Sequence, residues 1–313
     1  MKAIQFLTLT ALGAALFASC SNEEELTRGS YPNDNIIRVT AGVNNMTRGN
    51  EVTTALNKDF SLTVMNSTNG TYSYANEIFS LKGGTEWSST NKLLWENLAT
   101  PVEIVALYPA TDANTFSGVF SKESNSYGTI SYGVKPNQST RDDANDLLLY
   151  HNANFVPKDN LEDGKLDIQF NHAFCRVDIE VTIGSEFNAT NGLAANPIQG
   201  IKVEGTKTTA EIGFTSTAPF FTVTPSASGE VTSITPTLDD FTQAASATDQ
   251  AVAKYSCIVI PQTATLKVVV HTSDMEYEWT DTQKVLESGK QYTLQLNLKK
   301  SATTRNFILR ERK

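Results

Sequence analysis

Short runs of β-branched and aromatic residues, separated by turn-forming clusters, recur along most of this chain. Examples of the runs are "FSLTVMN", "PVEIVALYP", "TISYGV", "LDIQF", "CRVDIEVTI", "LKVVVHT" and "QYTLQLNL". Clusters such as "NSTNG", "KGG" and "ESGK" separate them. Alternation with a period of two places apolar side chains on one face of a strand. Many such strands at near-regular spacing predict an all-β fold of the sandwich or barrel type and argue against an α/β enzyme.

The chain begins with "MKAIQFLTLTALGAALFASC", which has the layout of a secretory signal. Lys2 supplies the positive charge, and the apolar stretch 4–17 is too short to span a bilayer comfortably. The ending "FASC" resembles the lipobox of bacterial lipoproteins, which implies that Cys20 becomes the lipidated first residue of the mature chain. An ordinary secretion signal with a coincidental cysteine is the alternative.

The remaining chain is long enough for two domains, and the sequence predicts the following divisions. They are a signal peptide at 1–19, a flexible tether at 20–35, an N-terminal β-sandwich at 36–163, a C-terminal β-sandwich at 164–298 and a tail at 299–313. The tether is acidic and polar and has nothing to bury. An acidic run behind a lipidated cysteine also resembles a surface-export signal, and a merely solvated leader is the alternative. The boundary between the sandwiches is placed in "FVPKDNLEDGK" because proline, glycine and charges gather there.

The charge and the scarcity of reactive groups exclude several classes of function. The formal net charge is −9 and no basic cluster occurs, so a nucleic-acid partner is not expected. His151, His172 and His271 are not at metal-ligand spacing from one another or from a cysteine. No P-loop, GxSxG or GxGxxG motif is present. The sequence therefore predicts a protein without catalytic residues, metal or cofactor.

Two further cysteines, Cys175 and Cys257, each lie in an apolar run that reads as a strand. Buried free thiols are one interpretation of these residues. A disulfide between them is the other, since a secreted protein meets an oxidising compartment. Spacing in the sequence does not decide between the two.

Several segments, taken in order, resemble the fimbrillin-like lipoproteins of Bacteroidales, the subunits of protease-assembled surface fimbriae. The segments that carry the resemblance are "IIRVTAGV" followed by "MTRG", "LLWENLATPVEIVALYP", "DLLLYHNANF", "LDIQFNHAFCRVDIEV", "CIVIPQT" and "LESGKQYTLQLNL". The resemblance implies two tandem transthyretin-like β-sandwich domains. It also implies a structural or adhesive subunit at the surface of the outer membrane, held there by its lipid. Its partners would be other fimbrial subunits, an arginine-specific protease and host or microbial surface ligands.

In such a family the first strand is cut away, and a strand of a neighbouring subunit replaces it. On this interpretation Ile37, Val39, Ala41 and Val43 are the core face of the covering strand. Arg48 is the site of the cut. Arg28 is the alternative site, and an exposed loop arginine without processing is the alternative for both.

The end of the chain supplies the candidate donor strand. Only "KKSATTRNFILRERK" follows the last clear strand, and its apolar patch is Phe307, Ile308 and Leu309. The sequence leaves open whether the protein is a stalk, tip or anchor subunit. A different class of function is a surface lipoprotein that binds glycans through exposed aromatic side chains, for which Trp87 and Trp279 are the candidates.

Overall fold

The computed structural model describes residues 34–44, 56–84, 86–110, 120–121, 126–215, 221–300 and 307–312. Strands dominate these residues, so the chain is an all-β protein, as the alternating runs predicted. The helical segments in this part of the chain are single turns. They are α1 (Pro157–Asn160) and the 3-10 turns η1 (Gly70–Tyr72), η2 (Asp143–Asn145) and η3 (Ser185–Phe187).

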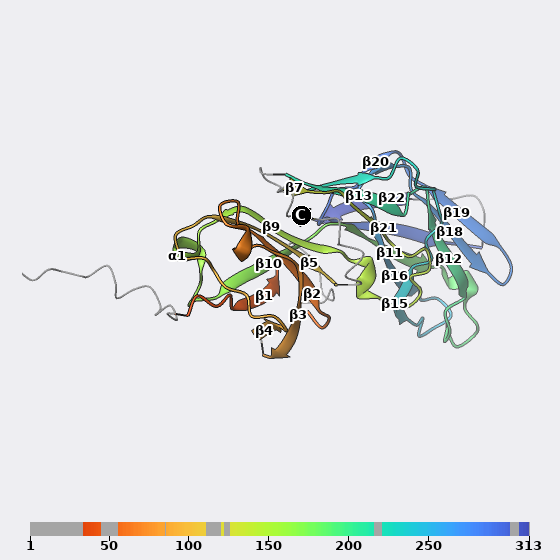
Figure 1. Ribbon diagram of the computed structural model, residues 1–313. Helices are drawn as coiled ribbons and strands as arrows, with labels where there is room; N and C mark the ends of the chain where they lie inside the picture. Colours follow the sequence, from red (N-terminus) through yellow and green to blue (C-terminus); the bar gives the residue numbers. More distant parts are fainter. Residues whose placement is uncertain are drawn as a thin grey trace, which may run out of the picture.

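The first unit is a closed barrel in which hydrogen-bonded neighbours follow the order β1-β10-β9-β5-β2-β3-β4. These strands are β1 (Val39–Val43), β2 (Phe60–Met65), β3 (Tyr74–Gly83), β4 (Glu86–Ser89), β5 (Val102–Tyr108), β9 (Leu148–Phe155) and β10 (Leu166–His172). They form the red to yellow-green half of Figure 1. The strand pattern predicted a sandwich or a barrel, and the family resemblance implied a β-sandwich at this place. The sheet closes instead because β1 pairs with β10 on one side and with β4 on the other.

Aromatic side chains from four strands of the barrel meet at its centre. The ring of Phe60 on β2 stacks on Phe79 of β3, with centroids 5.4 Å apart. Trp87 of β4 lies 4.9 Å from the same ring, and Phe170 of β10 meets it edge-on at 5.5 Å. Such pairs add to the free energy of burial because their quadrupoles favour offset and edge-on contacts. This apolar interior, which also contains Ile37 and Val39, is called the barrel core below.

The second unit contains several smaller sheets around a separate apolar interior, called the second core below. A five-stranded sheet has the order β15-β16-β11-β21-β22, and two three-stranded sheets have the orders β12-β18-β19 and β14-β13-β8. Short pairs form between β17 and β20 and between β6 and β7. The strands are β6 (Phe120–Ser121), β7 (Ser126–Tyr127), β8 (Ile130–Gly133), β11 (Cys175–Ile183), β12 (Ile198–Glu204), β13 (Thr209–Phe214), β14 (Phe221–Pro225), β15 (Thr237–Thr242), β16 (Ala251–Val259), β17 (Thr263–Ala264), β18 (Lys267–Thr272), β19 (Glu276–Thr280), β20 (Lys284–Val285), β21 (Gln291–Leu298) and β22 (Phe307–Arg312).

The two units are joined by strands that are buried on both faces. On β5, Ile104 and Ala106 belong to the barrel core, whereas Val105 and Leu107 belong to the second core. On β9, Leu148 and Leu149 divide in the same way, one to each core. A strand buried on both faces has no polar face, which explains why "VEIVALY" and "DLLLY" read as nearly continuous apolar runs.

The predicted division between residues 163 and 164 falls inside the barrel. It separates β9 from β10, although these two strands pair with each other. The punctuation in "FVPKDNLEDGK" belongs to the connection between them, where Asp163 and Gly164 adopt positive φ values of 47° and 74°. Gly164 accepts this left-handed conformation without a steric penalty, so the glycine marks a tight turn here. The chain first leaves the barrel between β5 and β9, where β8 pairs with β13 of the second unit, and it leaves the barrel again between His172 and Cys175.

Candidate functional site

The strand β1 closes the barrel, and its two edges are held to different extents. Along its whole length it lies parallel to β10, from Val39 opposite Leu166 to Val43 opposite Phe170. Its antiparallel pairing with β4 covers Val39 and Thr40. The register therefore makes β10 the main support of β1 and makes the β1–β4 contact the shorter seam of the barrel.

One face of β1 and of the residues just before it covers the barrel core. Ile37 and Val39 are 5% and 2% exposed. Ala41 and Val43 are partly buried and pack against the same core. Complete burial of an aliphatic side chain of this size stabilises a fold by about 1.5–3 kcal/mol. These residues hold β1 in place mainly through apolar burial, and removal of the strand would uncover the core beneath it.

The opposite face of β1 carries polar contacts. The Thr40 hydroxyl donates a hydrogen bond to Asp167 Oδ1 over 2.9 Å. Beyond the end of the strand, Asn44 donates from its backbone to Phe170 O and from its side chain to Asn171 Oδ1, over 2.9 and 3.0 Å. Every one of these partners lies on β10. The polar face therefore fixes the register of β1 on β10.

A bidentate ion pair lies just before β1. The Arg38 guanidinium donates to both carboxylate oxygens of Asp34, over 2.9 and 2.6 Å. The hydrogen bond from Arg38 lowers the pKa of Asp34 to about 2. The pair is exposed to solvent, so it adds little to stability.

A cavity of about 410 Å³ lies beside the seam between β1 and β4. Its wall includes Arg38 and Val39 on one side, Trp87 and the segment 88–92 on the other, and Lys165. The Lys165 ammonium forms an ion pair with Glu86 over 2.8 Å. The segment 88–92 lines the cavity between two contacts with the β1 segment, the Val39–Trp87 pair and the hydrogen bond from Ile37 N to Leu93 O.

The processing and lipidation residues predicted from the sequence are Cys20, Arg28 and Arg48, and they lie outside the residues that the structure describes. The candidate donor residues lie in β22. This strand pairs antiparallel with β21 of the same chain, where Phe307, Ile308 and Leu309 stand opposite Leu296, Gln295 and Leu294. The order of the sheet places β22 at its edge.

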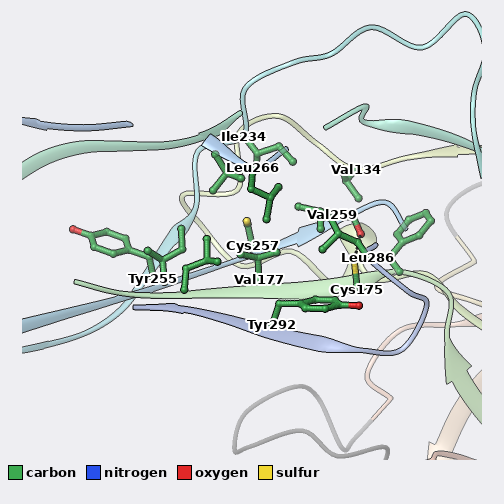
Figure 2. Packing of buried hydrophobic residues seen from close by; sticks show 14 of the residues in the cluster. Val134, Cys175, Val177, Ile234, Tyr255, Cys257, Val259, Leu266, Leu286 and Tyr292 are labelled. Carbon is green, nitrogen blue, oxygen red and sulfur yellow. Dashed lines mark hydrogen bonds between the residues drawn. The ribbon is translucent and has the colours of Figure 1, made fainter. Parts of the chain in front are cut away.

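The two cysteines of the second core do not form a disulfide with each other. Cys175 stands opposite Val259 and Cys257 stands opposite Val177, so the two residues are diagonal neighbours on β11 and β16. Figure 2 shows their sulfur atoms apart from each other within one apolar layer. Burial raises the pKa of the Cys257 thiol, and Cys175 Sγ donates to Val259 O over 3.3 Å. Both residues therefore serve the packing of the second core.

Two of the three histidines pair with carboxylates that are distant in the sequence. His151 Nε2 lies 2.6 Å from Glu103 Oε1, and His172 Nδ1 lies 2.9 Å from Asp146. Nothing in the local sequence pattern indicates the first pair, because it depends on the contact between β5 and β9. Within the described ranges, no group of three or more His, Cys, Asp or Glu side chains has the geometry of a metal site.

The acidic turn "RDDAND" distributes its side chains among separate partners. Asp142 accepts from Lys135 and Lys58, and the hydrogen bond from Lys135 is the main reason that its pKa lies well below the usual range. Asn145 Oδ1 accepts from the backbone of Lys135 over 2.7 Å. These contacts fix the turn that leads into β9.

Trp87 and Trp279, the candidates for glycan stacking, are buried in the two cores. They are 5% and 3% exposed. A sugar stacks on an exposed ring face, which neither residue offers. In the part of the chain that the structure describes, none of the helices has the length and apolar character needed to cross a bilayer.

Comparison with known families decides the class of this all-β chain. The model of the fimbrillin-like family matches residues 41–308. The chain belongs to the fimbrillin-like family. The match begins within β1 and ends within β22, so it includes the barrel and the second unit. No curated protein matches the sequence.

Several solved structures share the fold of this fimbrillin-like chain at low sequence identity. One is a candidate cell adhesion protein from Bacteroides uniformis, with 14% identity and a TM-score of 0.59 over 90% of this chain and 99% of that one. Another is a candidate cell adhesion protein from Bacteroides ovatus, with 14% identity and a TM-score of 0.58 over 90% and 97%. A fimbrial protein from Bacteroides vulgatus has 14% identity and a TM-score of 0.50 over 88% and 98%.

Proposed function

We propose that this protein is a structural and adhesive subunit of a bacterial cell-surface fimbria, exported as a lipoprotein through Cys20 and without catalytic activity. Membership of the fimbrillin-like family supports this function. So does the shared fold with proteins described as fimbrial or as candidates for cell adhesion. Its partners are other fimbrial subunits, an arginine-specific protease and the outer membrane, with host or microbial surface ligands as the target of adhesion.

The observation that carries the proposal is the position of β1. It is the first described strand of the chain, it closes the barrel, and its apolar face lies over the barrel core. A cut at Arg48, or at Arg28 as the alternative, precedes assembly. A cut at Arg48 frees the chain just beyond β1, whereas a cut at Arg28 leaves the strand attached.

Loss of β1 would create a groove between β10 and β4. The edge of β10 would then offer unpaired backbone groups, and the barrel core would offer a row of apolar pockets. An added strand satisfies both, because its backbone pairs with the edge and its alternate side chains fill the pockets. An open edge of this kind is a site of unwanted association, so β1 acts as its cover before assembly. Contacts between a groove on one subunit and a strand of the next are heterologous and produce a filament.

The transthyretin-like architecture is part of the same proposal. Without β1, the remaining strands would form the open order β10-β9-β5-β2-β3-β4 around the barrel core. That arrangement is a sheet folded over an apolar interior with one gap. The glycan-binding alternative has no comparable support, because the tryptophans on which it depended are buried.

The proposal is tested by locking β1 onto β10. Thr40 and Asp167 are Cα partners on the polar face, and their side chains already touch. Neighbouring strands lie about 4.8 Å apart, which a disulfide can bridge. A chain that begins at Ser21, and so lacks the lipidated cysteine, and that carries Thr40→Cys and Asp167→Cys should be cut by an arginine-specific protease and yet remain monomeric when oxidised.

The matched control is the same variant after reduction, which should form ladders on a denaturing gel together with the unmodified chain. Arg48→Ala and Arg28→Ala variants identify the cut that assembly requires. Equal assembly by the oxidised and reduced forms would contradict strand exchange at β1. So would a wild-type chain that stays monomeric after β1 has been released.

A further inference from the structure

The cavity beside the seam between β1 and β4 combines an apolar wall with polar side chains. The core residues Phe79, Trp87 and Leu93 contribute buried apolar surface to its wall. Ile36 also lines the cavity, and this side chain is half-buried and lies outside the barrel core. The volume of about 410 Å³ and this mixture of surfaces are typical of sites that bind small molecules.

Cations outnumber carboxylates in the wall of this cavity, although the chain as a whole has a net charge of −9. The lining cations are Arg38, Lys92 and Lys165, and the lining carboxylate is Glu86. Lys165 is paired with Glu86, and Arg38 is paired with Asp34. Lys92 has no hydrogen bond or ion pair with any residue that the structure describes. One positive charge beside the cavity is therefore left without a partner in the described part of the chain.

The side chains around that charge offer several hydrogen-bond donors. The Lys92 ammonium has three N–H groups, and the Arg38 guanidinium has five, of which two donate to Asp34. The hydroxyls of Ser88 and Thr90 line the same cavity. Hydrogen bonds from cations to a carboxylate are stronger than those between neutral groups. A ligand with one carboxylate and an apolar body therefore matches both parts of the wall.

We propose that this cavity binds a small carboxylate with an aliphatic or aromatic body. Its charged group lies between Lys92 and Arg38, and its body lies against Ile36. Such a ligand contacts both sides of the seam, because Ile36 and Arg38 precede β1 whereas Lys92 follows β4. It therefore stabilises β1 in its place in the barrel. Binding itself is independent of the proposed function, whereas the effect on release of β1 rests on it.

Isothermal titration calorimetry on the chain that begins at Ser21 tests the binding with three probes. 3-Phenylpropionate has both the charge and the apolar body, 3-phenylpropionamide lacks the charge, and acetate lacks the body. 3-Phenylpropionate should bind at least about tenfold more tightly than either of the others, since each lacks one of the two contacts. Equal affinities for the acid and its amide, or for the acid and acetate, would overturn the proposal. So would the absence of binding by all three probes.

Variants locate the site. Lys92→Ala should weaken the binding of 3-phenylpropionate about tenfold, because it removes a charged donor. Thr90→Trp should abolish binding by filling the cavity, and both residues are exposed, so the Tm of each variant should stay near that of the unmodified chain. Lys82→Ala is the matched control, since it removes the same charge from an exposed residue that does not line the cavity. An equal loss of affinity in Lys82→Ala and Lys92→Ala would place the ligand elsewhere and contradict the proposal.

The effect on β1 is measured with a site-specific protease sequence inserted after Arg48. After the cut, mass spectrometry of the gel-filtered protein gives the fraction that has lost its N-terminal fragment. 3-Phenylpropionate at about a hundred times its Kd should shift the release equilibrium about a hundredfold toward the bound strand, because the open form lacks one wall of the site. Release that is unchanged while the probe is bound would overturn this part of the inference. A fragment that never leaves, even without the probe, would instead contradict the proposed function, and the calorimetry would still decide whether the cavity is a binding site.

Discussion

Ile37 and Arg38 are neighbours in the chain but face opposite environments. Ile37 is buried in the barrel core, whereas Arg38 forms a solvent-exposed ion pair with Asp34. The first contact removes apolar surface from water, and the second is weakened by solvent and salt. The free energy that keeps β1 on the barrel should therefore come from its apolar face far more than from the charges beside it.

Ile37→Ala should lower the free energy of unfolding of the intact mature chain by about 2–4 kcal/mol, since it removes buried methyl groups and leaves a cavity. Urea unfolding followed by tryptophan fluorescence measures this change through its midpoint and slope. After proteolytic cutting, the same substitution should also speed the release of the strand, because the cover is held less firmly.

Arg38→Ala is the matched control, because it changes the adjacent residue on the opposite face. It should leave the urea midpoint nearly unchanged. If Ile37→Ala and Arg38→Ala had equal effects, the apolar face would not be what holds β1. No change from Ile37→Ala would mean that β1 lies outside the cooperative unit.

At the scale of single elements, the sequence indicated β1 well and its partners poorly. The alternation from Ile37 to Val43 is local, so the core face of the strand could be predicted from the sequence alone. The pairing of β1 with β10 joins residues that are 127 positions apart, as the Thr40–Asp167 contact shows. No local pattern encodes such a pairing, and so the closure of the barrel was not predicted.

The expected domain boundary between residues 163 and 164 falls between two paired strands for a related reason. Proline, glycine and charges indicate a turn, but they do not distinguish a linker between domains from a connection within one sheet. The continuous apolar run of β5 carried the better signal. A strand whose neighbouring residues Val105 and Ala106 enter different cores must lie between two layers, and its lack of alternation reflects this.

The tail strand β22 should be dispensable for folding. It lies at the edge of its sheet, whereas β21 keeps a parallel partner in β11 from Arg176 to Ile183 when β22 is removed. A chain that ends at Lys300 should therefore fold with a loss of about 1–3 kcal/mol, measured as a lower Tm by calorimetry. Once its own β1 has been cut free, it should also capture a labelled peptide of residues 34–46, which contains β1, as well as the full chain does.

A matched comparison is the removal of β21 and β22 together by ending the chain at Gly289. This chain should fail to fold, because Tyr292, Leu294 and Leu296 belong to the second core. A collapse of the shorter truncation to the same unfolded state would show that β22 is an integral part of the second unit. In that case β22 could not leave its own subunit to act as a donor strand.

At the scale of the whole molecule, the second unit supports the barrel while β1 is absent. β5 and β9 place Leu107 and Leu149 in the second core, where they are fully buried. β10 remains paired with β9 and so stays attached to this support. The groove that would receive a new strand is therefore formed by strands that the second core supports. The barrel need not be stable in isolation for the groove to persist.

This arrangement predicts that the barrel and the second unit unfold together. Leu107→Ala, which faces the second core, and Ile104→Ala, which faces the barrel core, should each lower the free energy of unfolding by about 2–5 kcal/mol. Both changes should appear in a single urea transition. The transition should be the same whether the fluorescence of Trp279 or that of the barrel tryptophans Trp87 and Trp95 is followed, with the other tryptophans replaced by phenylalanine in each case. Two separated transitions, with Ile104→Ala acting on the barrel alone, would show independent units. A barrel without that support would lose its structure with β1, and a preformed groove would not exist for a neighbouring strand to enter.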